Sequence, residues 1–195
     1  SFSVNEEQGL FYCFGCQASG DIFDFYGRIN GLDFRETLEQ LAAEAGDPAT
    51  FPVLDIGAGT GRNSLALARR GHPVDAVEMS PKFAEIILTE ARREELNVRV
   101  IARDVFTTAS DLRRDYQLIL LSEVVSDFRN VDQLATVFRL AAECLGPGGR
   151  LVFNIFLARD GYTPDAAARQ LGEQCYTSIF SYPEVARACA TVPLE

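Results

Sequence analysis

The sequence predicts an α/β fold in which helices cover both faces of a doubly wound, mostly parallel sheet. Short apolar runs predict five strands, at 53–56, 74–78, 98–102, 116–122 and 151–156. Helical spacing of the apolar residues between these runs predicts helices near 62–71, 81–95 and 131–145. Strands that alternate with helices favour parallel pairing through right-handed crossovers, and a glycine-rich turn after the first strand marks the edge where a ligand is expected.

The helix at 131–145 has the clearest pattern of these elements. Its apolar residues fall on one face, namely Val131, Leu134, Ala135, Phe138, Ala141, Ala142 and Leu145. The sequence Gly-Pro-Gly-Gly at 146–149 is expected to end this helix and to form the turn before the fifth strand.

The first 46 residues follow a different pattern from the rest of the chain. Strand-like runs at 1–4 and 10–14 bracket a polar turn, as a hairpin would, and two short helices with apolar faces follow. Residues 47–52 contain two prolines and small polar residues, which are typical of a linker. We therefore predict a small N-terminal module at 1–46, a linker at 47–52 and the α/β domain at 53–195.

Charge is distributed unevenly along the chain, whose formal net charge is −10. Residues 1–48 carry nine acidic side chains against two arginines, a balance of −7, and the remainder carries 19 acids against 16 bases, a balance of −3. A general binder of the phosphate backbone should be basic, so this balance disfavours nucleic acid and favours a small-molecule substrate. No apolar run approaches the length of a membrane span, and five irregularly spaced cysteines indicate a reducing cytoplasm.

The strongest local signal is the turn after the first strand, which reads VLDIGAGTGRN from Val53 to Asn63. Glycine is needed where the backbone turns tightly and approaches a ligand, and the amides that open the next helix are free to donate hydrogen bonds. Gly61 comes one residue too early for a dinucleotide fingerprint, and Arg62 stands where that fingerprint requires glycine or alanine. Asp55, two residues before the first glycine, suits a ligand with a cationic amino-acid end.

This segment resembles the first motif of class I S-adenosylmethionine-dependent methyltransferases, and the likeness extends from Val53 to the end of the chain. It implies a Rossmann-like fold, S-adenosylmethionine as the cofactor and methyl transfer as the activity. By this likeness Glu78 takes both ribose hydroxyls, Met79 packs against adenine, and Asp104 reads the adenine amino group. The cofactor-binding residues that the likeness implies are Asp55, Gly57, Ala58, Gly59, Gly61, Asn63, Glu78, Met79, Asp104, Val105 and Ser122.

Methyl transfer from a sulfonium is a direct displacement, which needs a base only when the nucleophile is protonated. The sequence shows no catalytic triad, and the single histidine, His72, is expected in a surface turn. Glu123 is a candidate base, with a structural carboxylate as the alternative. Arg159 and Tyr162 are candidates for substrate contact, or else belong to a turn that caps a helix from Asp165.

The acceptor is expected to be a small molecule, because Ser122 and the residues after it lack the Asn/Asp-Pro-Pro-aromatic motif of amino-methylating nucleic-acid enzymes. The sheet of the family ends with two further strands, and this chain stops where the first of them would begin. We therefore expect a truncated core whose fifth strand presents an open edge.

Residues 1–46 resemble the zinc-binding domain of bacterial DNA primases, through the hairpin, the Cys13-Phe14-Gly15-Cys16 knuckle and both helices. In that family a Cys-x-x-His pair upstream completes the zinc site. Cys13 and Cys16 supply two thiolates, whereas a closed structural site needs four ligands, so we expect a half site that binds zinc only if two copies share the metal. Ordinary buried thiols and a redox pair are the alternatives.

Three hypotheses about function follow. The favoured one is a methyltransferase for a small-molecule acceptor, preceded by a primase-like fragment. In the second, a nucleic-acid-binding primase-like module guides the methyltransferase, which the acidic charge disfavours. In the third, the chain is a non-catalytic truncated or chimeric product, which the missing sheet strands favour.

Overall fold

The computed structural model describes residues 2–5, 10–13, 19–21, 36, 47–155, 157, 158, 161, 165–175, 177–190 and 192. The chain divides into two compact units, Ser1–Pro48 and Ala49–Glu195. Within these described stretches, no helix combines the length and the apolar character that a membrane crossing requires.

The first unit contains a three-stranded antiparallel sheet of order β1-β2-β3. Its strands are β1 (Phe2–Asn5), β2 (Leu10–Cys13) and β3 (Ser19–Asp21). The predicted hairpin is confirmed, with Phe2 opposite Cys13, and β3 adds a strand that was not predicted. The two helices predicted after the hairpin lie outside the described residues, except for Glu36 of the second, which is helical.

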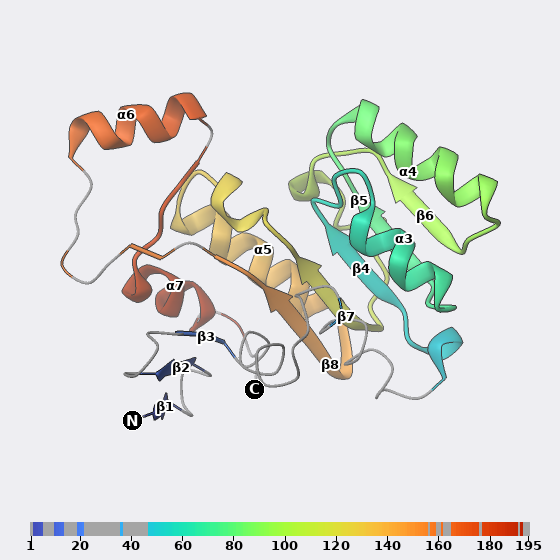
Figure 1. The fold of residues 1–195 in the computed structure, drawn as a ribbon, viewed down its shortest axis with the longest axis horizontal. Helices are drawn as coiled ribbons and strands as arrows, with labels where there is room; N and C mark the ends of the chain where they lie inside the picture. The colour runs from blue at the N-terminus through green and yellow to red at the C-terminus, as the bar shows by residue number, and fades with distance from the viewer. Residues whose placement is uncertain are drawn as a thin grey trace. The chain divides into compact units, whose positions relative to one another are not determined.

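The second unit is built on a five-stranded parallel sheet of order β6-β5-β4-β7-β8, which confirms the predicted α/β class (Figure 1). Its strands are β4 (Val53–Ile56), β5 (Val74–Val77), β6 (Val98–Ile101), β7 (Tyr116–Leu121) and β8 (Leu145–Phe153). The first four match the predicted strands to within one residue. All carboxyl ends of parallel strands meet at one edge of the sheet, so the loops that follow them lie close together.

The fifth strand differs from the prediction at both ends. Leu145 already pairs with Tyr116, so β8 begins directly after the preceding helix, and the Gly-Pro-Gly-Gly sequence forms a bulge inside the strand. The bulge requires glycine because a Cβ on Gly149 would lie 2.6 Å from the Tyr116 carbonyl oxygen. The strand then continues to Phe153. β8 is the last strand in the order of the sheet.

Helices follow the strands; the first three lie where the periodicity predicts them, the fourth begins next to Asp165, and the fifth was not predicted. They are α3 (Arg62–Arg69), α4 (Pro81–Arg93), α5 (Val131–Cys144), α6 (Ala166–Cys175) and α7 (Tyr182–Cys189), with short 3-10 turns η1 (Pro48–Thr50), η2 (Val105–Thr107) and η3 (Val125–Asp127). Asn130 caps α5 by accepting from the amide of Gln133 at 2.9 Å. Asp165 accepts from the amide of Ala168 at 2.8 Å, as a residue that caps α6 does.

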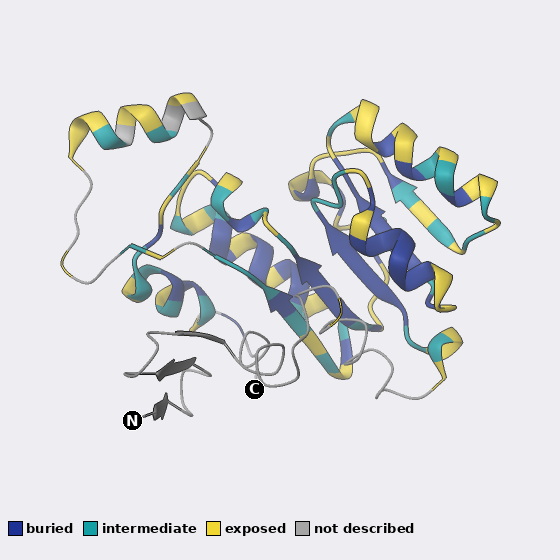
Figure 2. Ribbon diagram, in the orientation of Figure 1, coloured by how far each residue is buried: buried dark blue, intermediate teal, exposed yellow. Residues whose placement is uncertain are grey.

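The central strands and the sides of the helices that face the sheet are buried (Figure 2). On one face, Leu65 of α3 and Ile87 and Ala91 of α4 pack against Ala76 of β5. On the other face, the apolar side of α5 packs against the central strands, through Leu134, Phe138 and Ala141 on the helix and Leu54, Ile56, Ile119 and Leu121 on the strands. Burial on both faces explains why the central strands are mostly apolar, with Asp55 and Asp75 as buried exceptions.

His72 is buried, so its expected place in a surface turn is wrong. The residue is 1% exposed, and its Nδ1 lies 3.2 Å from the carbonyl oxygen of Phe51. The chain turns back beneath α3 after Gly71 and enters β5 at Val74, which carries His72 into the interior. Burial lowers the pKa of His72, and the contact with the Phe51 carbonyl raises it in part.

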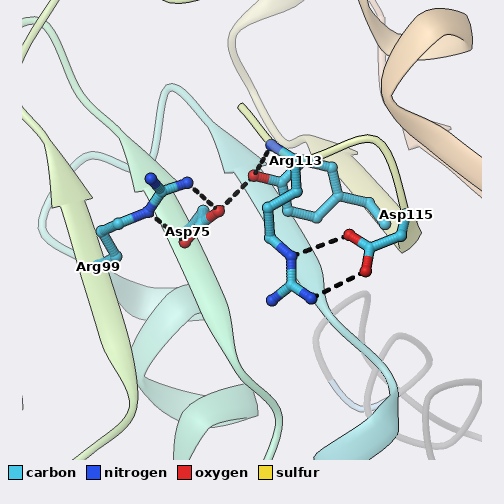
Figure 3. Close-up of polar contacts among 5 residues, drawn as sticks. Asp75, Arg99, Arg113 and Asp115 are labelled. Atoms are coloured by element: carbon cyan, nitrogen blue, oxygen red, sulfur yellow. Dashed lines mark hydrogen bonds and ion pairs between the residues drawn. The ribbon is translucent and has the colours of Figure 1, made fainter. Parts of the chain in front are cut away.

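A polar network joins three strands near their amino ends (Figure 3). The Asp75 carboxylate on β5 accepts two hydrogen bonds from Arg99 on β6, at 2.9 and 2.5 Å. The hydroxyl of Tyr116 on β7 donates to the same carboxylate and accepts from the amide of Arg113 at 3.3 Å. Tyr116 is fully buried. Its pKa is raised, most by this burial and next by the hydrogen bond to Asp75. A carboxylate this enclosed needs such partners, so the network stabilises the pairing of distant strands.

A second buried carboxylate lies on β4, where Asp55 faces α3. Asp55 is 1% exposed, and its Oδ2 accepts from Ser64 Oγ at 2.6 Å. Burial raises the pKa of Asp55 to about 6; the hydrogen bonds from Ser64 lower it and the negative charge of Glu78 raises it. Asp55 therefore joins the start of α3 to the centre of the sheet.

We predict that Tyr116→Phe destabilises the fold by about 1–3 kcal/mol, because the Asp75 carboxylate and the Arg113 amide each lose a buried partner. The measurement is urea unfolding at neutral pH. Arg93→Ala is the control: its contacts with Glu90 and Glu94 are solvent-exposed, so the loss should stay below about 1 kcal/mol. Equal losses in the two variants would contradict a structural role for the network.

Asp55 should make stability depend on pH. Its carboxyl binds a proton below about pH 6 in the folded state, but only below its ordinary pKa of 3.8 when unfolded. Because the folded state binds more protons between these values, the free energy of unfolding falls as the pH rises through this window. Urea unfolding should be measured at pH 4 and pH 8. The stability of Asp55→Asn relative to the wild type should be about 2 kcal/mol higher at pH 8 than at pH 4. A difference that stays constant with pH would refute the assignment.

Candidate functional site

A cavity of about 620 Å³ opens where the strands of the second unit end. This volume lies within the range of small-molecule sites. Four loops supply its wall, those that follow β4, β5, β6 and β7. The lining residues are Ile56, Gly57, Gly59, Val77, Glu78, Met79, Phe83, Arg103, Asp104, Val105, Phe106, Glu123, Val124, Asp127, Phe128, Arg129 and Gln133.

A second cavity, of about 330 Å³, lies between α5 and α7. Its lining includes Asp132, Arg139 and Arg187, and none of its residues belongs to a strand end. In an open parallel sheet ligands bind past the carboxyl ends of the strands, so the larger cavity is the candidate site.

The glycine turn after β4 forms one wall of the candidate site. Gly57, Gly59 and Gly61 have φ angles of 72°, 56° and 86°, a region that residues with a Cβ rarely adopt. A Cβ on Gly57 would lie 2.5 Å from Val124 Cγ2, whereas a Cβ on Gly59 would meet no atom within 4 Å. Gly57 therefore permits a close contact between two loops, and Gly59 keeps open space at the cavity.

Glu78 follows β5 and braces two turns. Its Oε2 accepts from the amide of Gly59 at 2.8 Å, and its Oε1 accepts from the amide of Ser80 at 2.7 Å. Glu78 is only 7% exposed, yet it lines the cavity. Each carboxylate oxygen has two lone pairs, so each retains one acceptor site after binding an amide.

The loop after β6 supplies the opposite wall. Asp104 caps η2 by accepting from the amide of Phe106 at 3.0 Å and also lines the cavity. Val105 is buried, whereas Met79 across the cavity is 71% exposed. The ring of Phe106 meets that of Phe128 edge-on, with centroids 5.9 Å apart. This side of the cavity is therefore largely apolar, with one carboxylate at its rim.

The loop after β7 carries the remaining charged groups. Glu123 has a φ of 59°, and its amide donates to Asn154 Oδ1 at 2.5 Å. Its carboxylate lies 3.5 Å from Arg62 Nη2. Burial raises the pKa of Asp127, and the charge of Arg129 lowers it in part. Glu123, Asp127 and Arg129 of this segment line the cavity, and Arg62, which contacts Glu123, lies outside the lining.

Six of the predicted cofactor residues line the cavity together: Gly57, Gly59, Glu78, Met79, Asp104 and Val105. The other five lie outside its lining, namely Asp55, Ala58, Gly61, Asn63 and Ser122. Among these, Asn63 Oδ1 and Ser122 Oγ are buried atoms with no hydrogen-bond partner among the described residues. Polar atoms of this kind call for a partner from water or a ligand.

Of the catalytic candidates, Glu123 lines the cavity, and Arg159 and Tyr162 lie outside the described residues. Cys13 belongs to β2, and Cys16 also lies outside the described residues. No group of three or more potential metal ligands occurs in the part of the chain that the structure describes.

Sequence reasoning missed several lining residues, among them Phe83, Phe106, Asp127, Phe128, Arg129 and Gln133. For Asp127, Phe128, Arg129 and Gln133 the one available signal was position, because they follow a central strand, β7. The individual side chains carry no motif.

Two segments of the chain match known families. Residues 53–149 match the family described as a methyltransferase domain, and residues 1–51 match the CHC2 zinc finger. DNA primase of Geobacillus stearothermophilus is 45% identical over 56 residues, which is 29% of this chain and 9% of the primase. DNA primase of Rickettsia typhi is 32% identical over 101 residues, 52% of this chain and 16% of the primase. The chain thus spans less than a fifth of these relatives.

Solved structures with the same fold are methyltransferases. Geranyl diphosphate C-methyltransferase from Streptomyces coelicolor A3(2) has a TM-score of 0.65 and 22% identity over 80% of this chain and 56% of that one. The CcbJ methyltransferase from Streptomyces caelestis has a TM-score of 0.53 and 26% identity over 63% of this chain and 49% of that one. The second unit therefore has the fold of methyltransferases, and residues 53–149 carry the match to the methyltransferase domain, whereas residues 1–51 carry the match to the CHC2 zinc finger.

Proposed function

We propose that the cavity binds S-adenosylmethionine and that the domain transfers its methyl group to a small-molecule acceptor. One observation carries this proposal: the glycine turn, Glu78 and Asp104 follow three strands that are neighbours in the sheet and line a single cavity. The S. coelicolor structure with the same fold contains S-adenosyl-L-homocysteine, which supports the same class of ligand here.

The residues present fit such a nucleoside. Gly59 leaves open space where any Cβ would intrude on a ligand. The two acceptor sites that Glu78 retains suit the neighbouring hydroxyls of a ribose. Met79 and Val105 would hold the adenine ring, and Asp104 would accept a hydrogen bond from its amino group.

The charge of the lining also supports a cationic ligand. Its acids are Glu78, Asp104, Glu123 and Asp127, against the two bases Arg103 and Arg129. A cavity with an excess of one sign concentrates ligands of the opposite sign. A sulfonium is such a ligand, and a phosphate is not.

The bound cofactor supplies an electrophilic methyl group on its sulfonium. The chain then has to align the acceptor with that methyl and to exclude water. Phe106 and Phe128 exclude water from the apolar side. Glu123 lines the end of the cavity nearest the glycine turn and accepts the proton of an acceptor that reacts in its protonated form.

Calorimetric titration with S-adenosylhomocysteine tests the proposed function. We predict that Glu78→Gln weakens binding at least tenfold, because an amide has one acceptor oxygen where the carboxylate has two, and charged hydrogen bonds contribute about 1.5–3 kcal/mol. Glu85→Gln on the exposed side of α4 is the control and should bind as the wild type does. An unchanged affinity in Glu78→Gln would remove Glu78 from the site, and no binding to the wild type would overturn the proposal.

A second candidate function rests on the CHC2 zinc-finger match: a zinc-dependent nucleic-acid-binding module at residues 1–51. Two features oppose it. The segment carries two cysteines and no histidine, and its acidic balance disfavours a phosphate backbone.

We predict that the chain, purified by gel filtration, contains well below one zinc ion per monomer, because two thiolates do not close a tetrahedral site. Elemental analysis is the measurement, with a Cys13→Ser, Cys16→Ser double variant as the blank. Stoichiometric zinc in a monomer, lost in the double variant, would establish the metal-binding module instead.

A further inference from the structure

Glu123 is held in an unusual backbone conformation at the cavity. Among the described residues, only Glu95 and Glu123 combine a side chain with a positive φ, and that of Glu123 is 59°. Such a conformation costs about 1–3 kcal/mol and persists where the surroundings enforce it. Here the hydrogen bond from its amide to Asn154 Oδ1, at 2.5 Å, ties the end of β7 to the segment after β8. The backbone of Glu123 is therefore fixed at the cavity wall.

The partner of the Glu123 carboxylate is bound weakly. Arg62 Nη2 lies 3.5 Å away, and the two side chains are 62% and 64% exposed. Ion pairs this exposed contribute between about 0 and 1 kcal/mol, so a competing carboxylate can displace Glu123 from Arg62. This pair therefore does not explain why Glu123 is strained.

The position of Arg62 is also unfavourable for the helix. Arg62 is the first residue of α3, directly after Gly61 of the glycine turn. A cation at a helix N-terminus is opposed by the helix dipole, which favours negative charge there. Arg62 and the free amides of the first helical turn together attract an anion at the edge of the turn.

The proposed cofactor brings such an anion. Its methionine end carries a carboxylate, and with the ribose at Glu78 and the adenine beside Asp104 we place this end against the glycine turn. Because Glu123 lines the cavity and contacts Arg62, the Arg62 guanidinium already meets a carboxylate at the cavity wall. Two carboxylates thus compete for one guanidinium.

We propose that Arg62 exchanges partners when the cofactor binds: it leaves Glu123 and pairs with the methionine carboxylate, and Glu123 turns free toward the acceptor. This inference rests on the proposed function. One ion pair replaces another. The fixed backbone of Glu123 then places its newly unpaired carboxylate beside the acceptor. The exchange makes Arg62 a positioning residue and requires the cofactor to bind before the acceptor.

The test compares S-adenosylhomocysteine with 5′-methylthioadenosine, which lacks the amino-acid end. Arg62→Ala should weaken calorimetric binding of S-adenosylhomocysteine about five- to tenfold and leave methylthioadenosine unchanged. Glu123→Gln should strengthen binding of S-adenosylhomocysteine about two- to fivefold, because the competing carboxylate is gone. Arg69→Ala, at the other end of α3, is the matched control and should change neither affinity.

The opposite signs of the two variants distinguish partner exchange from a general effect of charge. Arg62→Ala with unchanged binding of S-adenosylhomocysteine, or an equal loss for both ligands, would overturn the exchange and leave the proposed function intact. Weaker binding in Glu123→Gln would do the same. Absence of binding to the wild type would overturn both proposals.

Discussion

The candidate site depends on one close contact between two loops. Val124, after β7, packs against Gly57, after β4, so closely that a Cβ on the glycine would lie 2.5 Å from it. The two strands are neighbours at the centre of the sheet, with Asp55 opposite Leu120. Their loops consequently share a wall of the cavity. In that wall the glycine turn, which is proposed to hold the cofactor, lies next to the loop after β7, which is proposed to face the acceptor.

The polar groups at the two ends of the sheet differ in how completely they are hydrogen-bonded. At the amino ends, Asp75, Arg99 and Tyr116 form a closed network in which the carboxylate has three donors. At the carboxyl ends, polar atoms remain open, as with the second acceptor sites of Glu78 and the unpartnered Ser122 Oγ. Satisfied polar groups stabilise a fold, whereas incompletely satisfied ones are available to a ligand.

The strands were predictable because the central sheet is buried on both faces, which leaves a readable apolar run such as Val53–Ile56. Glu78 and Asp104 could be located for the same reason, since a polar residue after such a run lies at a strand end. The start of β8 could not be predicted, because Leu145 gains its strand pairing from Tyr116, far away in the sequence. His72 was misplaced because burial of a polar residue depends on the path of the chain.

The loop after β7 shows a different limit of sequence reasoning. Phe128 and Gln133 reach the cavity only because η3 and the cap of α5 fix the path between the two elements. No local pattern encodes that path. In the same way, the contact of Arg62 with Glu123 joins residues that are distant in sequence and carry no shared motif.

The bracing of two turns by Glu78 has a consequence for the cost of recognition. Its carboxylate already restrains the amides of Gly59 and Ser80 before any ligand arrives. The conformational entropy of these turns is thus lost during folding, and little is left to lose on association. Because these turns are preorganised, the entropy lost on binding should come mainly from exposed side chains at the cavity, such as Met79.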